Sequence, residues 1–305
     1  MTFLFMPILC VAQEETTLAF APSASTANAV PAFVLEIPES VSDVLIADTG
    51  SAILHRFGRT ASGIVSVEQR YMSIGQNGVG KERAWDRKTP LGVYFITEQL
   101  DTSYLDAKYG VAAYPLDYPN AWDTVKQRTG NGIWLHGVDE NESTRPPKDT
   151  DGCLALPNDE LLSLAATLIP LVTPVIVTRE LIWSTPDELE NIRMELRIAL
   201  EMWRQSLEEG DLLTYLSLYS DEFQHRGMDK ATWSSYRLGA FAARDIESVR
   251  LDDILLLADP EEAGLYLSRF SQEFVTDGGA VRTTKRLYWL RQDDNSWQIV
   301  AEGAG

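Results

Sequence analysis

Between residues 42 and 180 the hydrophobic and polar positions follow the pattern of short strands. Runs rich in β-branched, aliphatic and aromatic residues alternate with turn residues. One segment differs, because Asn158 can cap a helix in which Leu161, Leu164 and Leu168 recur at helical spacing. We therefore predict a mainly β domain over residues 42–180 with one helix near its end. The strands expected in this domain are 44–48, 52–57, 63–70, 92–97, 132–137 and 172–178.

The pattern changes in the second half of the chain. Thr185 begins a capping-box sequence with proline at the first helical position, and apolar residues then recur at helical spacing. Gly210 favours the end of this helix, and a second short helix is expected over about 212–219. From residue 246 onward, alternating runs separated by Gly- and Asp-containing turns predict antiparallel strands. Helices followed by a sheet indicate an α+β domain over residues 185–305.

The N-terminal residues have the features of an export signal. Residues 1–12 are apolar and end in small residues, and the first charge occurs at Glu14. This resembles the core and cleavage site of a secretory signal, although the usual positively charged start is missing. An apolar terminus without export function is the alternative, and a lipid anchor at Cys10 is disfavoured because Leu9 stands where a small residue is expected. We interpret residues 13–41, rich in Ala, Ser and Thr at first, as a tether.

Composition narrows the classes of partner and cofactor. The chain has 305 residues and a formal net charge of −19, with both halves acidic, so nucleic acid and anionic membrane surfaces are disfavoured partners. No apolar run after the N-terminus is long enough for a transmembrane helix. The chain has two cysteines and three histidines, without the spacing of a zinc site. We therefore expect neither a metal nor an organic cofactor.

The candidate chemistry lies between residues 133 and 158. His136 follows a predicted strand and Cys153 follows Gly152 across a polar loop. A thiol is a weak nucleophile until it ionises, and a neighbouring imidazole can take its proton. Gly152 permits a tight turn that brings backbone N–H groups towards a developing oxyanion. The alternative is a buried, inert cysteine near a histidine of the core.

Two motifs resemble the L,D-transpeptidases, the family with the YkuD-type fold. His136-Gly137, sixteen intervening residues and Cys153 in the sequence Thr150-Asp-Gly-Cys resemble the family's catalytic motif. Residues 88–96, KTPLGVYFI, resemble its "TPxGxY" strand. Two departures concern substrate orientation: Asp151 stands where many members have His, and Ala155 where many have Arg or Asn. An aspartate beside a thiolate is unfavourable unless a cation, such as Arg145 or Lys148 in the same loop, pairs with it.

The resemblance implies a cysteine enzyme that acts on peptidoglycan stem peptides in the periplasm. It gives Cys153 the role of nucleophile and His136 that of general base. The Gly137 carbonyl would orient the imidazole, and N–H groups at Gly152 and Cys153 would bind the oxyanion. The candidate substrate-binding residues are Tyr94, Trp134, Arg145, Thr150 and Asp151, although strand aromatics are more often core and Arg145 could be a solvated loop residue.

The acceptor of the acyl group stays open at this stage. An amine acceptor makes the enzyme an L,D-transpeptidase, which is the interpretation we favour from the catalytic motif. A water acceptor makes it an L,D-carboxypeptidase that trims tetrapeptide to tripeptide stems. A third alternative is a catalytically silent wall-binding protein in which the second domain is the working part.

The second domain resembles the nuclear-transport-factor-2-like (NTF2-like) fold, a curved sheet with helices closing a cavity. Trp203, Tyr215, Tyr219, Phe223 and the final strands carry this resemblance. Its combination with a transpeptidase domain resembles the L,D-carboxypeptidases that help to set the shape of helical bacteria. The domain could have a ligand or protein partner of its own. Residues 225–226, His-Arg, are interpreted as a surface turn, the alternative being the mouth of the domain's cavity.

Overall fold

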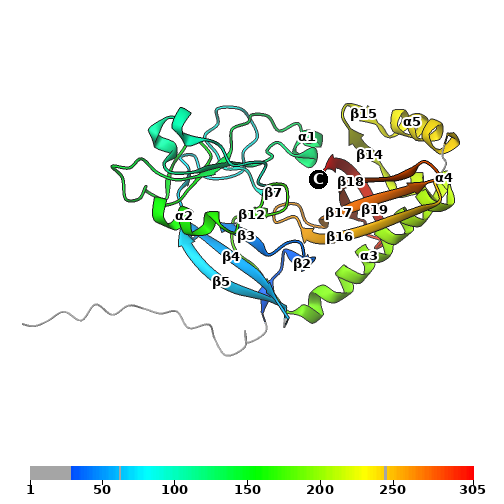
Figure 1. Cartoon of the computed structure of the whole chain (residues 1–305), viewed down its shortest axis with the longest axis horizontal. Coiled ribbons are helices and arrows are strands. Elements are labelled where there is room, and N and C mark those ends of the chain that lie inside the picture. The colour runs from blue at the N-terminus through cyan, green and yellow to red at the C-terminus, as the bar shows by residue number, and fades with distance from the viewer. Residues whose placement is uncertain (1–28, 62, 244–245) are drawn as a thin grey trace, which may run out of the picture.

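The computed structural model describes residues 29–61, 63–243 and 246–305. The predicted signal segment 1–12, the anchor at Cys10 and the tether up to residue 28 lie outside these residues. The described chain forms two β-rich halves that lie side by side (Figure 1). No helix among the described residues has the length and apolarity needed to cross a membrane.

The first half is built on a five-stranded sheet in the order β5-β4-β3-β12-β7. The central strand β3 pairs antiparallel with β4 and parallel with β12, which carries the chain back from the end of the domain. Five of the expected strands are therefore confirmed. Their bounds are β3 (Asp43–Asp48), β4 (Ile53–Thr60), β5 (Gly63–Tyr71), β7 (Gly92–Phe95) and β12 (Pro174–Thr178).

A smaller three-stranded sheet, in the order β11-β9-β8, packs against the first through a common apolar core. Around these strands lie a parallel pair, β6 with β10, two short helices and two 3-10 turns. The bounds are β8 (Ala113–Pro115), β9 (Trp134–His136), β11 (Leu154–Ala155), β6 (Ile74–Gly75), β10 (Lys148–Thr150), α1 (Ala121–Val125), α2 (Asn158–Ala165), η1 (Thr102–Tyr104) and η2 (Ala107–Tyr109).

The predicted cap of α2 is wrong. Pro157 is the N-cap residue, no side chain caps this helix, and α2 ends at Ala165, short of Leu168. Asn158 instead directs its side chain to the backbone of Val138, where it serves the candidate site.

In the second half, α3, α4 and the antiparallel strands β16 to β19 agree with the prediction. The order differs in one respect, because β14 and β15 precede a third helix and β14 pairs parallel with β19. Helix α3 begins after the Thr185 capping box and ends at Gly210, which has the left-handed φ of 75°. The helix over Lys230–Ala242 was not predicted, because Ser234, Ser235 and Gly239 in its interior weaken the helical signal. The bounds are α3 (Pro186–Glu209), α4 (Leu212–Ser217), α5 (Lys230–Ala242), β14 (Tyr219–His225), β15 (Met228–Asp229), β16 (Ser248–Ala258), β17 (Leu265–Thr276), β18 (Gly279–Arg291) and β19 (Trp297–Ala304).

Residues 30–41 are folded, so the predicted tether is wrong over this part. Strand β1 (Val30–Pro31) pairs with β13 (Trp183–Ser184), and β2 (Val34–Glu36) adds an edge strand to the second domain's sheet beside β16. Phe33 is 5% exposed and Val34 1% exposed. Two adjacent apolar residues give no clear periodicity, and their burial depends on a strand more than two hundred positions away.

The two halves share one apolar layer. Alternation along the strands of the second sheet sends one set of side chains towards α3, α4 and α5 and the other set towards the first domain. On the latter face, Leu257 and Tyr288 belong to the same core as Ile46 and Phe95 of the first domain. The Arg286 guanidinium pairs with Asp117 and lies 3.9 Å from the centre of the Phe95 ring.

Truncating Phe33 should therefore destabilise the protein. Phe33→Ala removes a buried ring from the layer between the domains, and we expect a loss of about 3 kcal/mol in the free energy of unfolding. Denaturant unfolding followed by tryptophan fluorescence measures it. Val65→Ala, at a 38% exposed position on β5, is the control and should change the free energy by less than about 0.5 kcal/mol. Equal effects of the two changes would contradict the core role of Phe33.

Candidate active site

The small sheet brings the predicted cysteine and histidine to one face. Cys153 immediately precedes β11, which runs parallel to β9 with Ala155 opposite His136 and Leu154 opposite Leu135. Leu135 and Leu154 belong to the core of the first domain. Because side chains alternate along strands, Cys153, Ala155 and His136 lie on the opposite face. The polar loop of sixteen residues thus returns the chain to the neighbouring strand.

The orientation of the His136 ring is fixed by the next residue. His136 is 3% exposed, and its Nδ1 lies 2.6 Å from the carbonyl oxygen of Gly137. A carbonyl oxygen only accepts hydrogen bonds, so Nδ1 carries the proton and Nε2 has the free lone pair. Burial, together with the positive charges of Arg145 and Lys108, lowers the pKa of His136 to about 4, against the hydrogen bond to Gly137 that raises it. The ring is therefore a neutral base at neutral pH.

Asn158 holds the turn that presents this carbonyl. Its Oδ1 accepts the Val138 N–H at 3.0 Å, and its Nδ2 donates to the Val138 carbonyl at 2.8 Å. The Gly137 N–H donates to the carbonyls of Tyr109 and Ala112, both at 3.1 Å. A Cβ on Gly137 would lie 2.1 Å from Asn158 Oδ1, so this packing requires glycine. The sequence offered no signal for Asn158 beyond its capping propensity.

Removing the Asn158 side chain should loosen the His136 turn. Asn158→Ala leaves the Val138 N–H and carbonyl without these partners, and we expect a loss of about 1–3 kcal/mol in the free energy of unfolding. If the imidazole loses its orientation, turnover should fall roughly tenfold while KM changes little. Asn158→Asp, which keeps the acceptor for Val138, should restore part of the rate. Turnover unchanged in Asn158→Ala would contradict the positioning role.

Cys153 is a buried thiol whose surroundings favour the protonated form. It is 7% exposed, and its Sγ donates to the Gly132 carbonyl at 3.4 Å. Burial raises the pKa of the Cys153 thiol to about 11, against a hydrogen bond from the Trp134 backbone that lowers it. Since His136 is neutral under the same conditions, nucleophilic attack by Cys153 requires transfer of the thiol proton to a base.

The loop before the cysteine is held by Thr150. The Thr150 hydroxyl accepts the Gly152 N–H at 3.1 Å and donates to the Cys153 carbonyl at 2.8 Å. Gly152 has a φ of 128°, and a Cβ there would lie 2.7 Å from the Lys88 carbonyl oxygen. Because the Gly152 N–H already donates to the Thr150 hydroxyl, its predicted part in binding an oxyanion is wrong. Thr150 is 3% exposed and positions the loop from below the surface, so its predicted contact with substrate is also corrected.

Three cations from separate segments act on Asp151 or on the Cys153 thiol. The Asp151 side chain is 67% exposed. Its carboxylate oxygens lie 3.7 Å from Arg87 Nε and 4.0 Å from Lys108 Nζ, so these two cations face it. Arg145, predicted as one possible partner, instead has Glu142 at 3.5 Å and donates to the Lys108 carbonyl at 3.2 Å. The charge of Asp151 raises the pKa of Cys153, whereas Lys108 and Arg145 lower it. These two cations thus partly offset the effect of the Asp151 carboxylate on the pKa of Cys153.

The aromatic candidates separate into one site residue and one core residue. Trp134 is half-buried on β9 and lies 4.6 Å, ring centre to ring centre, from Tyr109. The Tyr109 ring contacts His136 edge to face at 5.1 Å. Tyr94 is fully buried among core residues and donates to the Leu91 carbonyl at 3.0 Å. The predicted cleft role of Tyr94 is therefore wrong, because its strand turns it into the core.

Sequence reasoning missed Tyr109, Lys108 and Arg87. They come from segments far from the catalytic motif, and only the folded chain brings them to Trp134, His136 and Asp151. The "TPxGxY" motif did carry a signal, because it leads into β7 and the Lys88 backbone just before it packs against Gly152.

Comparison with known proteins gives two family matches. Residues 58–177 match the family model of the L,D-transpeptidase catalytic domain, and residues 195–303 match that of the Cds6 C-terminal NTF2-like domain. The predicted fold classes and their order are thereby confirmed. None of the curated proteins compared with the chain matches it.

Two solved structures are similar along most of the chain. Bd1075 from Bdellovibrio bacteriovorus is 26% identical with a TM-score of 0.74, over 91% of this chain and 98% of its own. The helical cell shape determining protein Pgp2 from Campylobacter jejuni is 25% identical with a TM-score of 0.72, over 86% of this chain and 91% of its own. Both similarities extend across the two domains.

Proposed function

Since residues 58–177 form an L,D-transpeptidase catalytic domain followed by an NTF2-like domain, we propose that the protein cleaves peptidoglycan stem peptides through a Cys153 thioacyl-enzyme. The observation that carries this proposal is the placement of Cys153 and His136 on one face of paired strands, with Nδ1 of His136 bound to the Gly137 carbonyl. This tautomer leaves Nε2 free to take the thiol proton. A buried, neutral thiol and a buried, neutral imidazole are the starting state for general-base attack.

The first half-reaction transfers the acyl group to sulfur. His136 Nε2 takes the thiol proton as the Cys153 sulfur bonds to the carbonyl carbon that precedes the terminal D-residue. The Cys153 N–H is the remaining candidate donor for the oxyanion, because the Gly152 N–H is bound to Thr150. When the tetrahedral intermediate collapses, the C–N bond breaks and the D-residue leaves as an amine with the proton from His136. A thioester on Cys153 remains.

The charges around the site suit a stem peptide. Such a peptide carries several carboxylates. The charges of Lys108 and Arg145 act on the Cys153 thiol, and Arg87 faces the neighbouring Asp151. Lys108 lies in the 3-10 helix η2, and Arg87 and Arg145 lie in two separate loops of an otherwise acidic protein. Electrostatic complementarity therefore favours an acidic peptide at this face.

We further propose water as the acceptor in the second half-reaction. His136 then removes a proton from water, hydroxide attacks the thioester, the C–S bond breaks and the thiol recovers its proton. Tetrapeptide stems become tripeptide stems, the activity that the combination of the two domains implies. Pgp2, similar along both domains, is a cell-shape determining protein, and trimming of stems removes a substrate for crosslinking. The same chemistry with an amine acceptor would be transpeptidation.

The substrate's position implies export. Peptidoglycan lies outside the cytoplasmic membrane, so the apolar segment 1–12 is proposed as an export signal and the periplasm as the site of action. We keep the boundaries 42–180 and 185–305 as the proposed domains, with residues 30–41 reassigned to the folded unit.

Product analysis distinguishes the acceptors. Purified protein is incubated with tetrapeptide muropeptides, and the products are identified by mass spectrometry. Tripeptide products without dimers support the carboxypeptidase. Crosslinked dimers, or exchange of the terminal residue for an added D-amino acid, would replace it with a transpeptidase. Absence of any product would favour a wall-binding protein and overturn the proposed function.

A further inference from the structure

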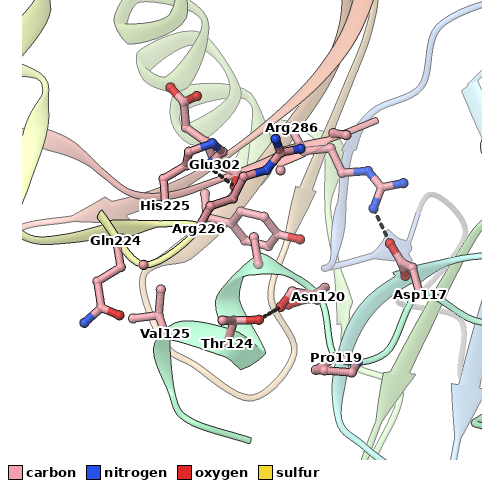
Figure 2. A pocket seen from close by; sticks show the side chains of 15 residues that line it. Asp117, Pro119, Asn120, Thr124, Val125, Gln224, His225, Arg226, Arg286 and Glu302 are labelled. Atoms are coloured by element: carbon pink, nitrogen blue, oxygen red, sulfur yellow. Dashed lines mark hydrogen bonds and ion pairs between the residues drawn. The ribbon is translucent and has the colours of Figure 1, made fainter. Parts of the chain in front are cut away.

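A polar cavity lies between the two domains, apart from the Cys153 and His136 site. It has a volume of about 310 Å³ and is lined by α1 with the residues before it, by the turn between β14 and β15, and by β18 and β19. Figure 2 shows Asn120 and Thr124 on the α1 side, with His225, Arg226 and Arg286 facing them from the second domain. None of the lining residues belongs to the Cys153 and His136 site. This interdomain cavity is large enough for an amino acid or a short peptide.

The buried charges on its wall are largely paired. Arg286 is 5% exposed and pairs with Asp117, while its Nε has no partner within the described chain. The Glu302 carboxylate is directed away from α1 (Figure 2). It lies 2.7 Å from Lys285 Nζ and accepts a hydrogen bond from the Tyr219 hydroxyl. Asp117 is therefore paired with Arg286, and Glu302 is paired with Lys285. Arg226, an exposed residue at the rim of the cavity, has no acidic partner among the residues that the structure describes.

Arg226 is held in a conformation that few residues favour. It has a φ of 48° and is followed by Gly227 with a φ of 80°, the geometry of a type I′ hairpin turn. Asn or Gly is preferred at the first position of such a turn, so an arginine there is strained. The Arg226 side chain makes no hydrogen bond or ion pair with any residue that the structure describes, although it lines the cavity. Strain and a free guanidinium at a cavity wall together indicate a ligand-binding role.

His225 adds a second polar group from the same turn. Its Nδ1 lies 3.1 Å from the Glu302 carbonyl oxygen, so Nδ1 is the donor and Nε2 stays free. Arg226, His225 and the unpartnered Nε of Arg286 give this wall an excess of positive charge and of donors. An anion is the ligand class that such a wall favours.

We propose that the interdomain cavity binds the carboxylate of an amino acid or short peptide, with Arg226 as its principal contact. A guanidinium binds a carboxylate through two parallel hydrogen bonds, which explains an arginine at a turn position that otherwise prefers asparagine. The choice of a peptide carboxylate over other anions rests on the proposed function, because both products of that reaction carry carboxylates. A ligand here contacts both domains and would couple their stability to the supply of product.

Binding is tested by calorimetry on the full chain carrying Cys153→Ala, so that no turnover interferes. The probes are D-alanine, the tripeptide product L-Ala-γ-D-Glu-diaminopimelate, and inorganic phosphate. The key variant is Arg226→Asn, which removes the charge and installs the Asn-Gly pair that this turn prefers, so it should fold at least as well. Arg226→Lys keeps the charge and is the matched control. Thermal unfolding without probe verifies the fold of both variants.

The expected result is that at least one carboxylate probe binds, that Arg226→Asn weakens this binding about tenfold or more, and that Arg226→Lys weakens it less. D-alanine binding assigns the cavity to the leaving residue, and tripeptide binding alone assigns it to the trimmed stem. Tripeptide bound equally by the Cys153→Ala chain with and without Arg226→Asn would overturn the proposal, and so would the absence of binding of both carboxylate probes. Phosphate bound as tightly as the carboxylates would overturn the ligand class. Turnover of tetrapeptides is assayed separately, so failure of the proposed function is seen independently.

Discussion

Replacing Cys153 by alanine is expected to reduce the release of the terminal D-residue by roughly 10⁴-fold or more. The proposed reaction proceeds through a bond between substrate carbon and the Cys153 sulfur, and alanine cannot form it. The side chain is small and 7% exposed, and its Sγ donates to the Gly132 carbonyl. The fold should therefore survive the change, with a thermal midpoint within a few degrees of the wild-type value.

The measurement combines kinetics with intact-protein mass spectrometry. Wild-type protein quenched during turnover of tetrapeptide substrate should show a mass increase equal to the acylated tripeptide, and Cys153→Ala should show none. Val65→Ala, at an exposed position on β5, is the control and should leave turnover unchanged. Substantial turnover by a folded Cys153→Ala protein would exclude the thioacyl mechanism.

The strands and helices that could be predicted are those with an intrinsic period. Strand β3 and its hairpin partner β4 alternate or are continuously apolar, and α3 has a capping box, a helical stripe and a terminal glycine. Such signals depend on neighbours in sequence. Strand β2 has none of them, because its burial depends on β16 at the far end of the chain. A three-residue edge strand cannot be recognised before its partner is known.

The residues of the candidate site also fall into two groups: those that a local motif predicts and those that only the folded chain brings together. Cys153, His136 and Gly137 belong to one local motif, and the pairing of β9 with β11 follows from the loop between them. Tyr109 and Asn158 act through contacts that no spacing predicts, since one approaches from a 3-10 turn and the other from a helix start. Tyr94 belongs to a motif and was predicted to line the cleft, but its side chain is buried in the core.

Replacing His136 by asparagine is expected to lower turnover at neutral pH by about 10³–10⁴-fold and to change the form of the pH profile. In the wild-type protein the base is neutral above its pKa of about 4, so turnover should be nearly constant from pH 6 to pH 9 and should fall only as His136 is protonated near pH 4. Without the imidazole, attack depends on the small fraction of Cys153 that is ionised. Because the pKa of Cys153 is about 11, this fraction rises about tenfold for each pH unit below that value.

The slope of the profile, rather than the loss of rate, therefore separates general-base catalysis from a structural role. Asparagine at position 136 can still donate to the Gly137 carbonyl, so the turn held by Asn158 should persist. Initial rates are measured from pH 5 to pH 9.5 on tetrapeptide substrate for wild type, His136→Asn and Asn158→Ala. We expect a flat profile for wild type and Asn158→Ala and a rising one for His136→Asn alone. A His136→Asn profile parallel to that of the wild type would mean that another group removes the thiol proton, and that the neutral imidazole only packs beside Tyr109.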